Sequence, residues 1–208
     1  MKHARVPEIT IHRLAVYARH LALLDMNHVN VVSSGELADA CKVNPAQIRK
    51  DLAYFGEFGV RGIGYYVKDL HLELRKILGL NKEWRLGLVG VGNLGAALLQ
   101  NASFLKRGYT FVKAFDQDPQ KIGTQVGDLT IDPVEKMGEE IKKAGIDIGV
   151  ITTQNHVAQE CTDILIKAGV HGILNFSPVQ LQVPSHVHIE NVDLTLKLDA
   201  LCYKITAH

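Results

Sequence analysis

The sequence predicts two domains of different fold class. Residues 1–80 are expected to form a winged helix-turn-helix, α-helical with a small β wing, and residues 85–190 an α/β Rossmann domain, followed by a C-terminal helix over residues 191–208. Two short helical segments around a tight turn, followed by a glycine-rich ribbon, predict the first domain. A GxGxxG loop after an apolar strand, with strands and helices alternating beyond it, predicts the second.

The composition is that of an ordinary globular protein. Of 208 residues, 47% are hydrophobic and 22% are charged, which is typical of soluble domains. No stretch approaches the roughly 18 apolar residues of a membrane span, and the N-terminus lacks the apolar core of a signal peptide. A cytoplasmic location is therefore expected.

Cysteine and histidine spacing argues against a metal site. The three cysteines, Cys41, Cys161 and Cys202, are far apart without a CxxC pair, and the ten histidines form no HxxxH pair. This fits neither structural zinc nor a disulfide framework. We expect no metal and interpret the cysteines as buried thiols, with a redox-reactive thiol as the alternative.

The charge is distributed unevenly along the chain. Residues 1–80 carry 11 Lys and Arg against 8 Asp and Glu, and the remainder carries 12 against 14. A positive front half and a slightly acidic back half are compatible with a nucleic-acid contact in the front half, although the excess alone is small.

Three helices are expected before the wing. Residues 9–26 carry apolar side chains at helical spacing,. Ser33 and Glu36 have the spacing of a capping box, which predicts a helix to about Cys41,. Asn44, as a cap before Pro45, predicts the next helix after a short turn,.

The third helix presents a candidate DNA-contacting face. Ile48, Leu52 and Phe55 fall on one side and should pack inward,. The other side and its margins carry small, polar and basic residues that can approach bases or phosphates: Ala46, Gln47, Arg49, Lys50 and Tyr54. For an isolated amphipathic helix, a solvated face is the simpler interpretation.

The following ribbon favours the DNA-binding interpretation. Val60, Ile63, Tyr65 and Val67 suit a short hairpin with glycine turns, which would be the wing,. Arg61 at its tip, beside Gly62, could enter a minor groove,. A further amphipathic helix should start at Asp69 and end at Gly79, and residues 79–84 should be the junction,.

The glycine loop at residues 90–95, GVGNLG, is placed as in a dinucleotide site. It follows an apolar strand, and a second strand, at residues 111–115, ends in Asp116, 21 residues past Gly95,. Gly90 would allow the turn, Gly92 the approach of a pyrophosphate, and Gly95 close packing of helix on strand. Asp116 would bond ribose hydroxyls and repel a 2′-phosphate, which favours NAD(H) over NADP(H). The alternative is a loop that only turns the chain.

Alternation continues to the end of the domain. Strands are expected near residues 129–131, 146–152, 171–176 and 187–190, and helices near residues 133–144 and 156–168, as in a doubly wound parallel sheet,. Ligands of such sheets bind at the carboxyl ends of the strands, where the loops carry Thr152, Thr153, Gln154, Asn155, Asn175, Phe176, Ser177 and Pro178.

The last segment carries an apolar stripe of Leu194, Leu198, Leu201 and Ile205. A completed sheet offers such a helix little to cover, so packing on a second copy of the chain is expected. A homodimer also suits a palindromic DNA site. The alternative is a helix folded onto its own domain.

The chain resembles the Rex family of redox-sensing transcriptional repressors over essentially its whole length. The resemblance is carried by QIRKDLAYFGEFGVRGIGY in the front half, and by GVGNLG, AFDQDPQKIG, AGVHGILNFSPV and ENVDL in the back half. It implies a homodimer in which the C-terminal helix is exchanged between subunits. It also implies that NADH closes the dimer and releases an inverted-repeat operator, while NAD+ competes.

The resemblance also implies roles for residues of this chain. Arg19 and Asp193 match a pair that couples domain position to ligand state, and Arg61 would serve the minor groove. The full set of candidate cofactor residues is Gly90, Val91, Gly92, Asn93, Leu94, Gly95, Asp116, Thr152, Thr153, Asn175, Ser177 and Pro178. The candidate DNA-contacting residues are Ala46, Gln47, Arg49, Lys50, Tyr54, Arg61, Gly62 and Tyr65.

Three positions depart from the family pattern. Asn93 stands where some members have a basic residue, Asn101 where some have a tyrosine, and Leu194 where some have an aromatic side chain near the nicotinamide. All three bear on how strongly NADH is preferred over NAD+.

Two other functions remain as alternatives. An NAD-dependent enzyme needs a proton donor beside the nicotinamide, and His156, the only candidate, has no evident orienting carboxylate,; no catalytic residue is expected. A CoA- or nucleotide-binding module is suggested by the segment NFSP, but Asp116 favours an unphosphorylated ribose,.

Overall fold

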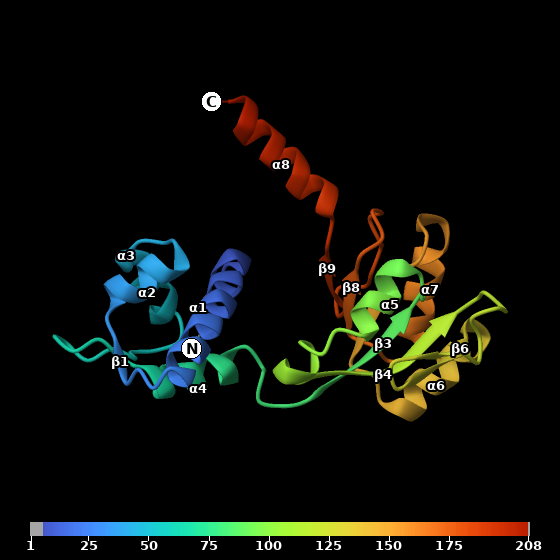
Figure 1. Ribbon diagram of the computed structural model, residues 1–208, viewed down its shortest axis with the longest axis horizontal. Coiled ribbons are helices and arrows are strands. Elements are labelled where there is room, and N and C mark those ends of the chain that lie inside the picture. The colour runs from blue at the N-terminus through green and yellow to red at the C-terminus, as the bar shows by residue number, and fades with distance from the viewer. Residues whose placement is uncertain (1–5, 208) are drawn as a thin grey trace. The chain divides into compact units, whose positions relative to one another are not determined.

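The structure is a computed structural model that describes residues 6–207. The chain divides between Lys82 and Glu83 into two compact units, which are described separately here (Figure 1). Among the described residues, none of the helices combines the length and apolar character needed to cross a bilayer.

The first unit is a small helical domain with a two-stranded sheet. Its elements are α1 (Glu8–Met26), β1 (Val31–Val32), α2 (Ser34–Cys41), α3 (Pro45–Ala53), β2 (Tyr65–Tyr66) and α4 (Val67–Ile77). The core takes Leu14, Tyr17 and Leu21 from α1, and Ile48 and Leu52 from α3. The inward face predicted for the third helix is therefore confirmed.

Side-chain caps set where α2 and α3 begin. The Ser33 hydroxyl accepts the Glu36 N–H at 3.1 Å, and the Glu36 carboxylate accepts the Ser33 N–H at 2.8 Å, which completes the predicted capping box. The Asn44 amide oxygen accepts the Gln47 N–H at 2.8 Å. Lys42, with φ of 55°, makes the tight turn between the two helices.

The predicted wing hairpin is only partly correct. Val60 bridges Gly64, but Tyr65 pairs with Val32 of β1, and Val67 already opens α4, two residues before the predicted start. The reason lies at Gly64, where φ is 110° and an added Cβ would lie 2.5 Å from the Val32 carbonyl oxygen. The chain therefore leaves the ribbon at this glycine and joins β1.

The second unit is a seven-stranded sheet in the order β5-β6-β4-β3-β7-β8-β9. Its strands are β3 (Trp84–Val89), β4 (Tyr109–Asp116), β5 (Gln125–Val126), β6 (Leu129–Pro133), β7 (Ile148–Ile151), β8 (Gly172–Asn175) and β9 (His188–Asn191). All neighbours are parallel except β5, which pairs antiparallel with β6. The predicted parallel sheet is confirmed, and the short antiparallel edge is an addition.

The helices of this unit are α5 (Asn93–Leu99), α6 (Met137–Ala144), α7 (Asn155–Lys167) and α8 (Leu194–Thr206), with 3-10 turns at Leu105–Arg107 and Val134–Lys136. The chain runs from β3 to β4 on one side of the sheet and later returns to β7 on the other side of β3. The sheet therefore has its switch point at the carboxyl end of β3, where ligands bind in such sheets.

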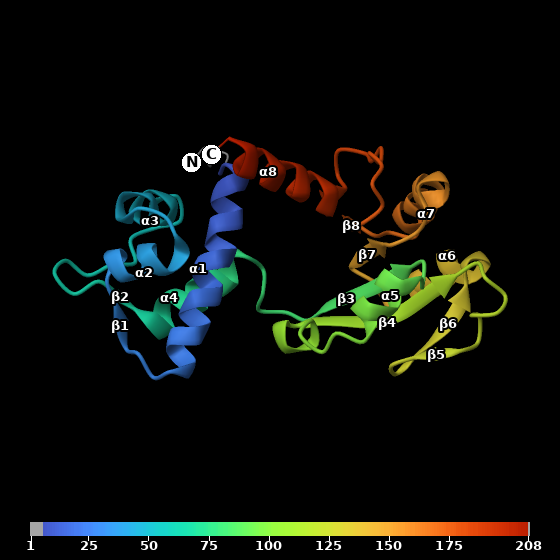
Figure 2. The same cartoon turned by 45° about the horizontal axis from the view of Figure 1, so that its top comes forward.

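Helix α8 stands away from the sheet of its own unit in both views (Figures 1 and 2). It begins at Leu194, later than the predicted residue 191, because β9 continues to Asn191. All of its residues are exposed, including Leu194 at 65%, Leu198 at 58% and Ile205 at 68%. The predicted apolar stripe therefore does not pack on its own domain.

Candidate nucleotide cavity and DNA-facing surface

The loop after β3 can be built only with glycine at two positions. Gly90 has φ of 97°, and a Cβ there would lie 2.9 Å from the Thr152 carbonyl oxygen. A Cβ on Gly95 would lie 2.3 Å from the Gly90 carbonyl oxygen. Gly92 differs because a Cβ there would meet nothing within 4 Å, so its open side lets a ligand come close to the backbone.

Asp116 closes this loop from the end of β4. Its side chain is 6% exposed, and its carboxylate accepts the Val91 N–H at 2.7 Å and the Asp118 N–H at 2.9 Å. Lys121 lies 3.4 Å from the same carboxylate. Two backbone donors leave lone pairs on both oxygens, which is what two ribose hydroxyls require.

A cavity of about 780 Å³ opens at this end of the sheet, within the usual size of nucleotide sites,. Five of the predicted cofactor residues line it: Gly90, Gly92, Asp116, Thr152 and Thr153. Gln154, which was expected in a loop at the ligand end of the sheet, also lines the cavity. The lining is completed by residues that were not predicted: Val89, Gln117, Asp118, Pro119, Lys121, Val134, Glu135, Val157, Glu160, Cys161 and Ile164. The apolar residues of the lining could not be predicted, because in the sequence their spacing is the same as that of residues buried in the core.

The charge of the lining favours an unphosphorylated ribose. It contains the carboxylates of Asp116, Asp118, Glu135 and Glu160 and a single ammonium group, from Lys121. A 2′- or 3′-phosphate on the nucleotide would meet this negative field, whereas neutral ribose hydroxyls can donate to it.

The two threonines after β7 have different roles. The Thr152 hydroxyl lies 2.7 Å from the Gly90 carbonyl oxygen and 3.1 Å from that of Val89, so it fastens the glycine loop to β7. The Thr153 hydroxyl oxygen is buried and has no partner among residues 6–207. A buried hydroxyl without a partner is uncommon in folded proteins, and this one belongs to a residue that lines the cavity,.

The other predicted cofactor residues do not line the cavity. Asn175 is 1% exposed and Ser177 is 5% exposed. The Asn175 amide donates to the carbonyls of Ser177 and Val179 and to Asn191, and the Ser177 hydroxyl donates to the Thr153 carbonyl at 2.6 Å. The polar groups of both side chains are engaged in hydrogen bonds within the protein, and these bonds stabilise the loops.

The remaining predicted residues of those loops also lie outside the cavity lining, and their contact with the cofactor stays a prediction. Pro178, Asn93 and Leu94 are exposed and Val91 is buried, and none of them belongs to the cavity lining. Val91 acts through its backbone N–H, which holds Asp116. Asn101 has its amide oxygen engaged by the Ser103 N–H and hydroxyl at 3.0 and 2.6 Å.

The cysteine at the cavity wall is buried, which raises its pKa. Burial, with a smaller contribution from Glu160, raises the pKa of Cys161 to about 11, and burial raises the pKa of Cys41 to about 11. Both thiols therefore stay protonated at neutral pH. Cys161 is buried, Cys41 is half-buried and Cys202 is exposed, so the interpretation of all three as buried thiols holds fully only for Cys161.

Most of the predicted DNA-contacting residues lie on the surface of the first unit. Ala46, Arg49, Lys50 and Tyr54, on and just after α3, are exposed, as are Arg61 and Gly62 in the wing. The Arg49 guanidinium donates to the Ser34 hydroxyl at 3.1 Å. Gln47 is half-buried, and its amide donates to Asp51 at 2.8 Å.

Tyr65 is a correction. Its side chain is 6% exposed and belongs to the core of the first unit, so it is not available to DNA. The physical reason is strand alternation, because successive side chains point to opposite faces. Tyr66 next to it points outward and is 46% exposed.

The predicted switch residues belong to different units. Arg19 is exposed on α1. Asp193 caps α8, where its carboxylate accepts the Thr195 hydroxyl at 2.6 Å and the Thr195 N–H at 2.8 Å. These bonds lower the pKa of Asp193 below its ordinary value. A coupling between Arg19 and Asp193 stays a prediction.

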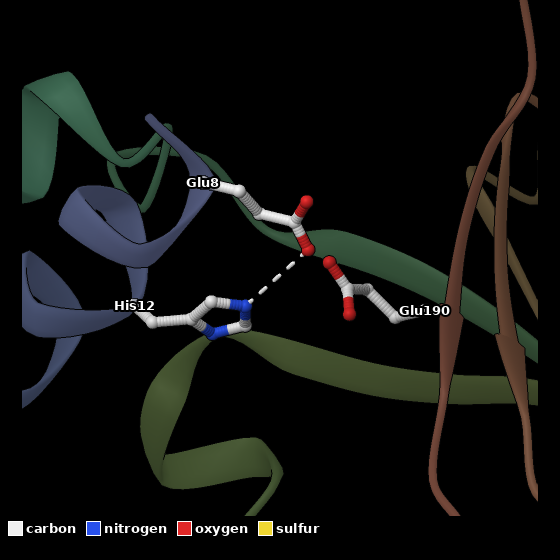
Figure 3. Close-up of side chains that lie close together, drawn as sticks. All are labelled: Glu8, His12 and Glu190. Atoms are coloured by element: carbon white, nitrogen blue, oxygen red, sulfur yellow. Dashed lines mark ion pairs between the residues drawn. The ribbon is translucent and has the colours of Figure 1, made fainter. Parts of the chain in front are cut away.

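A side-chain contact between Glu8 and His12 lies at the start of α1. Glu8 and His12 are one helical turn apart, with Oε1 and Nε2 separated by 3.7 Å (Figure 3). Glu190, also drawn in Figure 3, belongs to β9 of the other unit and is not counted with them. The pair is exposed and is a surface contact of small energetic value.

A helix-turn-helix with exposed basic side chains, joined in one chain to a Rossmann sheet with a nucleotide-sized cavity, defines a nucleotide-responsive DNA-binding protein. Two family models match accordingly. One described as "Putative DNA-binding protein N-terminus" matches residues 5–53, and one described as "CoA binding domain" matches residues 81–179.

Full-length relatives make the class specific. The redox-sensing transcriptional repressor Rex of Syntrophobacter fumaroxidans is 51% identical over 207 residues, covering 99% of each chain. Rex of Desulfitobacterium hafniense is 50% identical over 205 residues, covering 99% of this chain and 98% of its own. The chain belongs to the Rex family of redox-sensing transcriptional repressors, and the resemblance found in the sequence is confirmed.

Solved structures agree. The structure of RSP in complex with β-NAD+ and operator DNA matches with a TM-score of 0.93 at 38% identity, over 98% of this chain and 94% of that one. RSP in complex with β-NADH matches with a TM-score of 0.89 at 37% identity, over 98% and 96%. The predicted fold class, a winged helix followed by a Rossmann domain, is thereby confirmed.

Proposed function

We propose that this chain represses transcription by binding an inverted-repeat operator as a homodimer, and that NADH bound in the cavity of the second unit releases it while NAD+ competes. The observation that carries the proposal is the open Asp116 carboxylate beside the glycine loop, in a chain whose first unit has exposed Arg49 and Lys50 on α3. RSP, a relative of this chain, has been solved with both nucleotides and with operator DNA.

The residues divide the work between the units. Asp116 binds the adenosine ribose, the loop around Gly92 receives the pyrophosphate, and Thr153 offers its unpartnered hydroxyl. In the first unit, Arg49 and Lys50 contact phosphates and Arg61 enters the minor groove.

The dimer is proposed from α8. A helix with its whole apolar stripe exposed requires a partner, and a second copy would cover it, exchanged between subunits as the family resemblance implies,. Arg19 and Asp193 would then couple the distance between the two DNA-binding units of the dimer to the bound nucleotide. To shift operator occupancy from nearly full to nearly empty, NADH must favour the closed dimer by about 5 kcal/mol.

A catalytic role is not part of the proposal. The relatives are named as repressors, and His156, exposed at the start of α7, pairs with no carboxylate among the residues that the structure describes. Nothing therefore orients it as a proton donor. A repressor acts on chromosomal DNA, so we also propose a cytoplasmic location.

A CoA-binding module is the second candidate, because the family model over residues 81–179 carries that description. The cavity argues against it. CoA has a phosphate on its adenosine ribose, and the acidic lining around Asp116 disfavours a phosphate there,.

A gel-shift titration tests the proposal. A duplex selected by the protein from a randomised library should be released by micromolar NADH, should stay bound with NAD+ alone, and should be rescued from NADH by excess NAD+. CoA at the same concentration should have no effect. Retention of the duplex at saturating NADH would reject the sensor function.

A further inference from the structure

Asp51 is a buried carboxylate in the first unit, and the sequence did not assign it to any site. It is 1% exposed and lies on α3, the helix that presents Arg49 and Lys50. Its two oxygens accept five hydrogen bonds: from Thr10 at 3.3 Å, from Arg13 at 2.6 and 2.7 Å, from Tyr17 at 2.8 Å and from Gln47 at 2.8 Å.

Four of the five bonds join two helices. Thr10, Arg13 and Tyr17 all belong to α1, so the carboxylate ties α3 to the longest helix of the unit. The Arg13 guanidinium holds both oxygens in a two-pronged contact, which fixes direction as well as distance. The bidentate contact therefore adds a directional restraint on α3 to the apolar packing of Ile48 and Leu52,.

Energy alone does not explain the arrangement. Apolar side chains of similar volume stabilise a fold as well as a buried ion pair does, or better, because both charges must lose their water. What the bidentate pair adds is a fixed direction between the Arg13 and Asp51 side chains,. Desolvation raises the pKa of Asp51, but the hydrogen bonds from Arg13, Tyr17 and Gln47 outweigh it and lower the pKa, so the carboxylate is ionised at neutral pH.

The fifth bond reaches the DNA-facing side. An ionised carboxylate only accepts hydrogen bonds, so the Gln47 amide must turn its nitrogen towards Asp51,. The amide oxygen and the second N–H of Gln47 have no partner among the described residues. An oxygen acceptor beside an N–H donor is the pair of groups that bonds the N6 and N7 atoms of adenine in the major groove.

We infer that Asp51 is a positioning residue for DNA reading, which orients α3 through Arg13 and sets the Gln47 amide to read an adenine. The inference rests on the proposed operator binding by α3 and adds a source of sequence discrimination to it. Asp51 itself does not touch DNA. Arg49 and Lys50 supply affinity for any duplex, whereas Asp51 acting through Gln47 supplies preference for one sequence.

The test measures discrimination rather than affinity. The probes are a duplex selected by the wild-type protein from a randomised library and a scrambled duplex of the same composition. In the full-length protein without NADH, Asp51→Asn should lower the ratio of the two affinities by about tenfold, the order of one lost base contact. Asp39→Asn, the same charge change at an exposed position on α2, should leave the ratio unchanged.

A double-mutant cycle separates positioning from general stability. Gln47→Ala should lower the ratio by a similar factor, and the double variant should lose no more than either single variant, because both act on one contact. Affinity for the scrambled duplex should change little in all three. If Asp51→Asn does not fold, Tyr17→Phe, which removes one hydroxyl, should still lower the ratio.

The outcomes are decisive. Full discrimination in Asp51→Asn, or in Tyr17→Phe where Asp51→Asn is unfolded, overturns the inference, as does additive loss in the cycle. Selection of no duplex at all by the wild-type protein would instead overturn the proposed operator binding, and the inference with it.

Discussion

Asp51 in the first unit and Asp116 in the second are both buried carboxylates, but their hydrogen bonds differ. Asp51 accepts five bonds from side chains, which exceeds the roughly four lone pairs of a carboxylate,. Asp116 accepts two backbone N–H groups and one long contact from Lys121. A carboxylate without spare acceptor capacity supports other residues, whereas one with spare capacity can bind a ligand.

The largest expected effect comes from the loop that Asp116 holds. Gly95→Ala should weaken NADH binding by roughly 30–100-fold, corresponding to about 2–3 kcal/mol of overpacking against the Gly90 carbonyl. NADH fluorescence measures it, and binding of the selected duplex should persist. Gly138→Ala on α6, where a Cβ would make only ordinary contact at 3.9 Å, is the matched control. Unchanged NADH affinity in Gly95→Ala would show that the glycine loop does not contribute to nucleotide binding.

The hydrogen bonds to Asp51 should make the stability of the protein depend on pH in the acid range,. Because the folded-state pKa of Asp51 is lowered, its stabilisation is fully present above the unfolded-state pKa of about 4 and is lost as the pH falls through the lower folded-state pKa. Asp51→Asn should be less stable by about 3 kcal/mol at neutral pH, since Arg13 loses its partner. The wild type should then lose stability more steeply below about pH 4.

Hydrogen exchange of the α1 and α3 amides as a function of pH measures this change in the intact chain. Asp39→Asn on α2 should follow the wild type at every pH. Equal acid slopes for Asp51→Asn and the wild type would show that the five bonds do not hold the carboxylate ionised.

The open carboxylate should show a smaller but more specific effect. Asp116→Asn keeps the size of the side chain but loses the charge and one acceptor, so NADH affinity should fall about tenfold, as for one charged hydrogen bond. NADPH affinity should not fall, because the loss of the ribose hydrogen bond is offset by the loss of the negative charge that repels the 2′-phosphate. Calorimetry with both nucleotides tests this, with Asp128→Asn in the exposed β5–β6 turn as control. A proportional loss for NADPH would mean that Asp116 does not contact the ribose edge.

Local rules predicted much of this molecule. The capping box at Ser33 and the cap at Asn44 depend on neighbours within a few residues, and each is found as expected. Gly90 has the positive φ expected of a turn glycine, although the atoms that exclude a Cβ there belong to Thr152, 62 residues away. Tyr65 was misplaced because strand alternation leaves open which of two adjacent tyrosines points inward.

The errors and omissions depend on contacts between distant segments. Asn175 and Ser177 end the correct strand, but their polar groups bond backwards to the fold. Asp51 lies three residues after Ile48 on the inward face, which was the available signal, but its partner Arg13 is 38 residues earlier. The cavity wall from α7, including Val157 and Ile164, has the same apolar spacing as core residues.

Lys121 offers the finest test of the comparison, because among residues 6–207 it is the one side chain that already uses acceptor capacity on Asp116. Its ammonium group lies 3.4 Å from Asp116 and 3.7 Å from Asp118, and its side chain is 39% exposed. It therefore offsets part of the negative field that rejects a phosphorylated ribose. Lys121→Gln should raise the ratio of the NADPH to NADH dissociation constants by about two- to fivefold, the range of a solvent-screened ion pair.

The control for this variant is Lys142→Gln, the same charge change at an exposed position on α6 outside the cavity lining. The effect should shrink at high salt, since the interaction is partly exposed. A fall in the ratio would instead show that Lys121 supports the contact of Asp116 with the ribose more than it attracts a phosphate.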